Sequence, residues 1–242
     1  MLSNIDLSLN NRKIKNRDSH EVTPPVHFSL KEIKQHFDES MDILKAQFKV
    51  AESLASEANY EGCKTIWRSQ VVFAEALLDY YIHEMSKFCL FRMFTGRWDK
   101  SEKYSMLLVP MGKVENAIEA KSSNGWFFEY LNERFSREVF LSKECIKDQL
   151  NLIGIGFGPV MKKAFPKSSE QISIRTGGQV VADLFYRRNL IVHQNDRSHA
   201  SAIQNDIDEL FVSNSFLNIE KIVKAIHDLA EEKEFKESQK DD

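Results

Sequence analysis

The sequence of 242 residues contains few residues that interrupt helices or cross-link a chain: nine glycines, five prolines and three cysteines. So few glycines and prolines argue against a β fold with many tight turns and favour long helices. Cys63, Cys89 and Cys145 lie far apart and show none of the close Cys/His spacing of a zinc site. An odd cysteine count behind a polar N-terminus favours reduced thiols, so we expect a cytoplasmic protein without a signal peptide.

The chain also lacks a long apolar run and an excess of positive charge. Its longest apolar stretch, residues 150–161, is interrupted by three glycines and falls short of the roughly 18 residues that span a bilayer. We therefore expect no membrane partner. The net charge of -3 provides no basic field over the whole protein, so nucleic-acid binding would need a local patch. The hydrophobic content of 42% is ample for the core of a soluble domain.

What the chain does have is helical periodicity. Ser29 followed by Glu32 has the spacing of a capping box and predicts the start of a first helix. Apolar residues then recur every three or four positions for about seven turns, at Ile33, Phe37, Met41, Leu44, Phe48, Ala51 and Leu54. A second long helix is expected over residues 64–94, ended by Gly96. Its apolar side is expected to carry Ile66, Phe73, Leu77, Tyr81, Met85 and Phe88.

The rest of the chain predicts shorter helices followed by two longer ones. The short helices are expected at 113–121, 126–136, 142–152 and 159–165. A helix over 179–193 follows a turn at Gly177-Gly178, and a last helix begins near Ser213 or Asn218 and frays after residue 231. The predicted fold is all-α, an antiparallel helical bundle with additional inserted short helices. Its expected boundaries are a flexible arm (1–27), a helical domain (28–232) and a charged tail (233–242).

The helix over 179–193 carries the chain's most informative side chains, Arg188, Asn189 and His193. Arg188 falls on the apolar face of that helix, and burying an unpaired guanidinium costs several kcal/mol. It therefore needs a carboxylate, a phosphate or access to solvent. On a straight helix Arg188 and His193 point about 140° apart. They would converge on one ligand only if the helix unwound near His193, if Arg188 reached around it, or if a second protomer completed the site.

Arg188-Asn189 followed by His193 resembles the Arg-x(4–6)-His motif of the HEPN superfamily. Residues 187–193, with Asp196-Arg197 just after them, are similar to RiboL-PSP-type HEPN domains. The resemblance covers residues 30–232 in outline, although the helices between 97 and 168 exceed a minimal HEPN bundle. It implies a HEPN-like helical fold and a metal-independent endoribonuclease, of the kind found in toxin–antitoxin and phage-defence systems. It also implies a possible antitoxin or other regulatory protein as a partner.

The residue types suit RNA cleavage by transesterification, in which the ribose 2′-OH attacks the phosphate. The reaction needs a base, an acid and positive charge on the phosphorane. His193 can fill one proton role, Arg188 can stabilise the phosphate, and Asn189 can position it. Because one histidine fills only one proton role, we expect a homodimer with a composite active site, as the family resemblance also implies. No cofactor and no metal are expected.

Five further residues are candidates for RNA binding or support of the site: Arg187, Arg197, Glu84, Asp79 and Glu75. The two arginines would extend the positive charge around the motif, or be ordinary surface residues. Glu84, at the margin of the apolar side of the second helix, is the expected carboxylate partner of Arg188. Glu75 and Asp79, with His83, form a stripe four residues apart, which is either a solvated face or the lining of a dimer cleft. Their spacing matches no standard metal site.

Two other interpretations remain open at this point. A catalytically inactive HEPN domain would bind RNA, a nucleotide or a protein without cleaving anything. A structural helical adapter would hold Arg188 in a buried ion pair and His193 at a helix end, where the helix dipole favours a cation. In the adapter, Arg188→Ala would mainly destabilise the fold.

Overall fold

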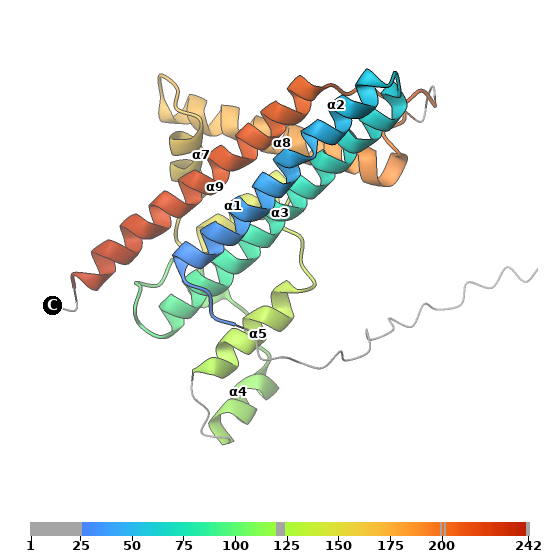
Figure 1. The fold of residues 1–242 in the computed structure, drawn as a ribbon. Helices are drawn as coiled ribbons and strands as arrows, with labels where there is room; N and C mark the ends of the chain where they lie inside the picture. The colour runs from blue at the N-terminus through green and yellow to red at the C-terminus, as the bar shows by residue number, and fades with distance from the viewer. Residues whose placement is uncertain (1–25, 120–123, 199, 201, 241–242) are drawn as a thin grey trace, which may run out of the picture.

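The computed structural model describes residues 26–119, 124–198, 200 and 202–240. The all-α prediction is confirmed (Figure 1): over these residues there is no β-strand, only one isolated bridge between Arg197 and Gln204. In chain order the helical elements are α1 (Leu30–Ala46), α2 (Phe48–Ser56), α3 (Tyr60–Phe94), the 3-10 turn η1 (Tyr104–Met106), α4 (Met111–Glu119), α5 (Gly125–Phe135), α6 (Lys143–Leu152), α7 (Phe157–Ala164), α8 (Glu170–Gln194) and α9 (Glu209–Ser238).

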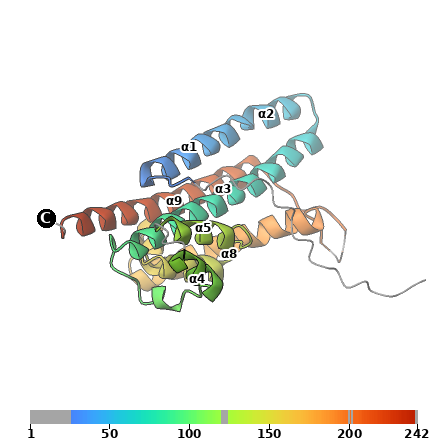
Figure 2. The same cartoon turned by 90° about the horizontal axis from the view of Figure 1, so that it is seen from below.

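Four long segments form the bundle: α1 continued by α2, then α3, α8 and α9. Arg92 near the end of α3 pairs with Glu234 near the end of α9 at 2.5 Å, so these two helices run in the same direction. Arg68 near the start of α3 pairs at 2.9 Å with Asp196, just after the end of α8, so α8 runs the opposite way. Figure 2 shows α1 and α2 on one side of α3 and α9, and α8 on the other. The helices α4 to α7 are inserted between α3 and α8.

The first helix begins as predicted but is shorter. Ser29 and Glu32 form the expected capping box, which satisfies backbone donors of the first turn. The expected seven-turn helix is interrupted at Gln47, which separates α1 from α2. The side-chain amide of Gln70 on α3 donates to the carbonyl oxygen of Leu44 at 3.0 Å, and this inserted group occupies an acceptor that a continuous helix would use. The apolar positions Ile33, Phe37, Met41, Leu44 and Ala51 are nevertheless buried.

The second helix, α3, is longer than predicted and is buried on more than one side. It begins at Tyr60 instead of residue 64, with the Asn59 side chain capping its first turn, and it is followed by Gly96 at φ +76°. The expected apolar side is wrong at Phe73, which is 55% exposed. Helices α1, α2, α5, α6, α8 and α9 all contact α3. On a helix surrounded in this way, apolar periodicity no longer identifies a single buried face.

The expected short helices in the middle of the chain are all present. Ser142 caps α6, and its side chain accepts from the backbone N–H of Cys145 at 3.1 Å. The Tyr130 hydroxyl on α5 donates to the carbonyl of Leu108, which anchors the segment leading into α4. None of the residues of α4 is buried, and this helix projects from the bundle beside α5 (Figure 1).

The predicted turn at Gly177-Gly178 is wrong. Helix α8 begins nine residues before the expected residue 179, at Glu170, and runs straight through both glycines. They permit close packing: a Cβ on Gly177 would lie 2.8 Å from the Phe165 ring and closer still to the Met161 sulfur. A Cβ on Gly178 would meet the Lys143 side chain at 3.0 Å. Here glycine serves a close approach of helices, not a bend of the backbone.

The last helix is longer at both ends than predicted. Asp208 caps α9, so the helix starts before Ser213, and it continues to Ser238 beyond the expected fraying at residue 231. Glu234 anchors the extra turns, because it also accepts a hydrogen bond from the Trp98 indole at 2.5 Å. Part of the predicted charged tail is therefore packed helix. Residues 1–25 of the predicted arm lie outside the described residues, while the His27 ring stacks on Phe128.

Apolar side chains from all the long helices meet in one core around α3. Its largest fully buried members include Tyr81, Phe37, Phe127, Phe135 and Phe216. None of the described helices combines the length and apolar character that crossing a membrane requires.

Candidate functional site

The motif Arg188-Asn189…His193 lies in the last two turns of α8, in regular helix. The helix ends at Gln194, and Asn195 and Asp196 follow with left-handed backbone conformations (φ 50° and 57°). The helix therefore does not unwind near His193, which removes one of the three ways in which Arg188 and His193 could converge. Arg188 is partly buried on the side of α3, whereas His193 is exposed.

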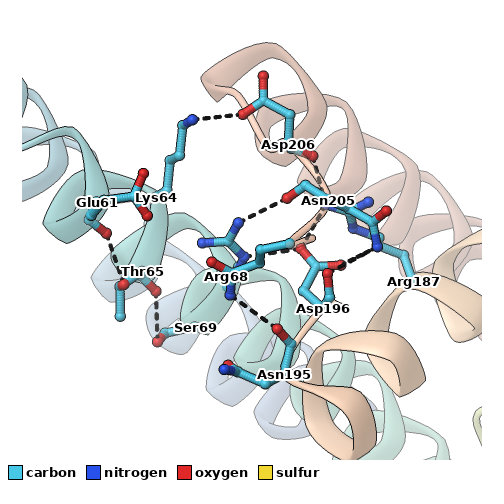
Figure 3. A network of polar contacts seen from close by, with 11 residues as sticks. Glu61, Lys64, Thr65, Arg68, Ser69, Arg187, Asn195, Asp196, Asn205 and Asp206 are labelled. Atoms are coloured by element: carbon cyan, nitrogen blue, oxygen red, sulfur yellow. Dashed lines mark hydrogen bonds and ion pairs between the residues drawn. The ribbon is translucent and has the colours of Figure 1, made fainter. Parts of the chain in front are cut away.

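A buried ion-pair network fixes the segment that follows the motif (Figure 3). Asp196 has no exposed surface, and its carboxylate accepts from Arg68 Nε at 2.9 Å and from an Arg187 amino group at 2.8 Å. The Asn205 side chain donates to the same carboxylate at 3.2 Å, and its backbone N–H donates to the Asp196 carbonyl at 2.7 Å. The network joins the start of α3, the end of α8 and the loop before α9.

The expected contribution of Arg187 to an RNA-binding patch does not match its surroundings. Besides the Asp196 carboxylate, Arg187 donates to the Asp206 carbonyl at 2.7 Å, and its guanidinium lies 5.4 Å from the centre of the Phe211 ring. With these three contacts the Arg187 side chain stabilises the folded chain. The network could not be predicted from local sequence patterns, because Arg68 and Asp196 are separated by 128 positions.

Arg188 has very different surroundings from its neighbour Arg187. Its one hydrogen bond within the described chain joins an amino group to Asn189 Oδ1 at 3.1 Å. Arg188 Nε is buried and has no hydrogen-bond partner among the described residues. No described carboxylate forms an ion pair with Arg188, so the interpretation of Arg188 as a member of a buried ion pair is wrong. A partly buried guanidinium with unused donors favours an anionic ligand.

The carboxyl group whose pKa Arg188 influences is that of Glu75, not that of the expected Glu84. Glu84 pairs instead with Lys87 on its own helix at 2.6 Å, because it lies on the side of α3 that faces away from α8. Glu75 is only 2% exposed, and its Oε1 atom has no hydrogen-bond partner among the described residues. Burial raises the pKa of Glu75 to about 8, against the opposing effect of the positive charge of Arg188. Glu75 is thus largely protonated at neutral pH and leaves the charge of Arg188 uncompensated.

The stripe of Glu75, Asp79 and His83 was predicted to be either a solvated face or the lining of a dimer cleft. It is not a solvated face. Asp79 accepts from the backbone N–H of Phe140 at 2.6 Å and lies 3.5 Å from His83 Nε2. The His83 ring in turn lies 4.6 Å from the Phe140 ring, centre to centre. Asp79 and His83 therefore hold the segment between α5 and α6 against α3. A contribution of the stripe to a dimer cleft stays a prediction.

The remaining motif residues are accessible. His193 is exposed in the last turn of α8, and Asn189, one turn earlier, is partly exposed. Tyr186 lies two turns before His193 on the same helix face and is 66% exposed. Arg197 is exposed and donates to the Ala202 carbonyl at 2.6 Å, within the same loop. The structure thus places Arg188 beside Asn189 and close to Glu75, while His193 lies one turn beyond Asn189, exposed at the end of the helix.

In the described part of the chain, no group of three or more His, Cys, Asp or Glu side chains is placed to hold a metal ion. Comparisons of the sequence and the fold with family models, curated proteins and solved structures give no match.

Proposed function

We propose that this chain is a HEPN-like, metal-independent endoribonuclease whose active site contains Arg188, Asn189 and His193. The observation that carries the proposal is the state of Arg188. Its guanidinium is partly buried, has no ion-pair partner among the described residues, and lies near the Glu75 carboxyl, whose pKa burial raises to about 8. A phosphate of the RNA backbone would supply the missing anion and a planar match for the guanidinium donors.

The chemistry assigned to each residue follows from its surroundings. Arg188 binds the scissile phosphate and stabilises the additional negative charge of the phosphorane. Asn189, already hydrogen-bonded to Arg188 at 3.1 Å, orients the guanidinium and donates to a phosphate oxygen. His193, exposed at the helix end, takes the proton from the 2′-OH or returns one to the leaving 5′-oxygen. The products are a 2′,3′-cyclic phosphate and a 5′-OH.

A second protomer solves the geometric problem that one protomer leaves. His193 and Arg188 point to different sides of a regular helix, so one chain cannot easily place both on a single phosphate. A two-fold dimer that brings two α8 ends together would place Arg188 of one protomer beside His193 of the other. Tyr186 and Val192, 66% and 44% exposed near the motif, provide contact surface for such a dimer. A toxin or antiviral-defence role is what the family resemblance adds.

The decisive experiment incubates purified protein with total cellular RNA and tRNA in EDTA. His193→Ala and Arg188→Ala should each lower the rate of cleavage by about a hundredfold or more. Arg175→Ala, a change at an exposed arginine on the same helix, is the matched control and should cut like the parent. Ends are analysed for 2′,3′-cyclic phosphate, and folding is compared by thermal denaturation. Absence of cleavage by the parent protein on every RNA would refute the proposal.

Mixing the two inactive variants tests the composite site. If Arg188 and His193 act across the interface, each mixed dimer regains one intact site. Random exchange of protomers then restores about one quarter of the parent activity. If both residues act within one protomer, the mixture stays inactive.

The alternative is a catalytically inactive domain that binds RNA or a nucleotide. The separation of His193 from Arg188 favours it, because anion binding needs only the arginine. In that case RNA binding survives His193→Ala, is lost in Arg188→Ala, and no cyclic-phosphate ends form.

A further inference from the structure

A large pocket lies at the other end of α3 from the candidate site, where the start of α1 and the start of α5 meet the last turns of α3. Its volume is about 730 Å³, within the roughly 300–1,000 Å³ range of small-molecule sites. The lining residue of α3 that is nearest to Glu75 is Glu84, nine residues later, which is about 14 Å along the helix and on its opposite side. The pocket is therefore separate from the motif on α8, and nothing in the proposed function uses it.

The walls of the pocket are rich in aromatic rings: His27, Phe28, Phe88, Phe91 and Phe128. The imidazole of His27 stacks on Phe128 with ring centres 3.6 Å apart and an angle of 21° between the planes. Burial and the charge of Lys87 lower the pKa of His27, so this ring is neutral at neutral pH. The wall thus already accommodates a flat, neutral nitrogen heterocycle, which is the chemistry of a nucleobase.

The pocket contains a positive charge that has no partner among the described residues. Of the two carboxylates that line it, Glu84 pairs with Lys87, whereas Glu32 accepts hydrogen bonds from the backbone and hydroxyl of Ser29 and keeps its negative charge. The Arg97 side chain is exposed and makes no hydrogen bond or ion pair with any described residue. Arg92 already pairs with Glu234 and lies 4.9 Å from the centre of the Phe88 ring, but its buried Nε atom has no hydrogen-bond partner among the described residues.

A third source of positive potential is the start of α5. The residue before this helix, Asn124, makes no side-chain capping hydrogen bond, and both Asn124 and Gly125 line the pocket. The first backbone N–H groups of a helix carry partial positive charge and favour an anion. This helix start and the two arginines line the same pocket as the aromatic rings.

We propose that this pocket binds a nucleoside monophosphate, with its base among the aromatic rings and its phosphate at Arg97 and Arg92. The base requirement follows from the rings, and the phosphate requirement follows from the unpaired donors. Both halves of the ligand should contribute to affinity, because the two kinds of wall lie in one pocket.

Isothermal titration calorimetry on the full chain tests this with three probes: AMP, adenosine and ribose 5-phosphate. We expect AMP to bind saturably, and more tightly than either fragment. Arg97→Gln should weaken AMP binding about five- to tenfold and leave adenosine unchanged, because it removes one charge-assisted contact to the phosphate. Arg175→Gln, which removes an exposed arginine outside the pocket, is the control and should bind AMP like the parent.

Three outcomes would overturn the proposal. These are the absence of saturable AMP binding to the parent protein at millimolar concentration, binding of ribose 5-phosphate as tight as that of AMP, and binding of AMP by Arg97→Gln as tight as by the parent. All measurements are independent of RNA cleavage, so a failure here leaves the proposed nuclease activity untouched, and the reverse is equally true.

Discussion

Arg187 and Arg188 are neighbours in the chain, yet their guanidinium groups have opposite surroundings. Arg187 shares the fully buried Asp196 carboxylate with Arg68 and also stacks on Phe211. The Arg188 side chain makes one hydrogen bond among the described residues, to the adjacent Asn189. A step of 100° around a helix is enough to turn one side chain toward the loop before α9 and the next toward α3.

This difference predicts unequal effects on stability. Arg187→Gln should lower the free energy of unfolding by about 2 kcal/mol, because it removes one member of a buried, hydrogen-bonded ion-pair network. Arg188→Gln should change it by less than about 1 kcal/mol, since it removes no ion pair and relieves a partly buried charge. Urea denaturation at neutral pH measures both. Equal losses in the two variants would mean that Arg188 has an ion-pair partner in solution.

Glu75 predicts a specific dependence of stability on pH. The unfolded chain releases the Glu75 proton near pH 4.5, whereas the folded chain holds it until about pH 8. The folded state therefore binds more protons in this window, and the contribution of Glu75 to stability falls as pH rises from about 4.5 to about 8. Glu75→Gln has no such proton to lose. Relative to the parent, its free energy of unfolding should rise by about 2–5 kcal/mol across the window.

The measurement is a series of urea denaturation curves between pH 4.5 and pH 8.5. Glu129→Gln, at an exposed glutamate on α5, serves as the control and should run parallel to the parent. A constant difference between Glu75→Gln and the parent at every pH would show that Glu75 ionises normally in the folded protein.

At the scale of the helices, the close packing at Gly177 predicts that Gly177→Ala lowers the free energy of unfolding. Helix propensity alone would predict the reverse. Alanine is a better helix former than glycine by about 1 kcal/mol. Its methyl group would, however, press on the buried Met161 and Phe165 side chains. We expect Gly177→Ala to lower the free energy of unfolding by about 1–3 kcal/mol. Gly112→Ala on α4 is the matched control, because a Cβ there meets nothing within 4 Å, and it should be neutral or stabilising.

Helix starts with local capping were predictable, and helix features set by tertiary contacts were not. The capping box at Ser29 and Glu32 and the short helix after Ser142 were read correctly, because a cap and its target lie three residues apart. The interruption at Gln47 depends on a side chain 23 positions later, Gln70, whose bond to Leu44 no local pattern reveals. The glycines in α8 were read as a turn for the same reason.

In the candidate site, too, some features could be predicted from helical geometry and others depend on tertiary contacts. The placement of the motif on one late helix, and the wide angle between Arg188 and His193, followed from helical geometry. The choice of carboxylate did not. Glu84 and Glu75 both lie on α3, and only the packing of α8 beside one face of that helix selects Glu75. The structural role of Arg187 also could not be predicted, because it shares the Asp196 carboxylate with Arg68, more than a hundred positions away.

At the scale of the whole molecule, α3 connects the two sites that we propose. Its first half faces α8 and carries Arg68 and Glu75, and its second half lines the aromatic pocket with Phe91 and Arg92. One rigid helix thus passes beside both sites. The proposed nuclease site and the proposed nucleotide pocket can be tested separately because their residues do not overlap.

The position of α9 has a consequence for how the protein is made. Ile219, Ile222, Val223 and Ile226 of this helix are fully buried in the core beside α3, yet α9 is synthesised after all the other described helices. Until α9 has been added, α1 to α8 therefore surround an unfilled core, and apolar surface that α9 later covers stays exposed. The loop that carries Asp196 between Arg68 and Arg187 leads directly into α9. The site that we propose at the end of α8 would therefore acquire its working shape only after α9 has been synthesised and has packed beside α3.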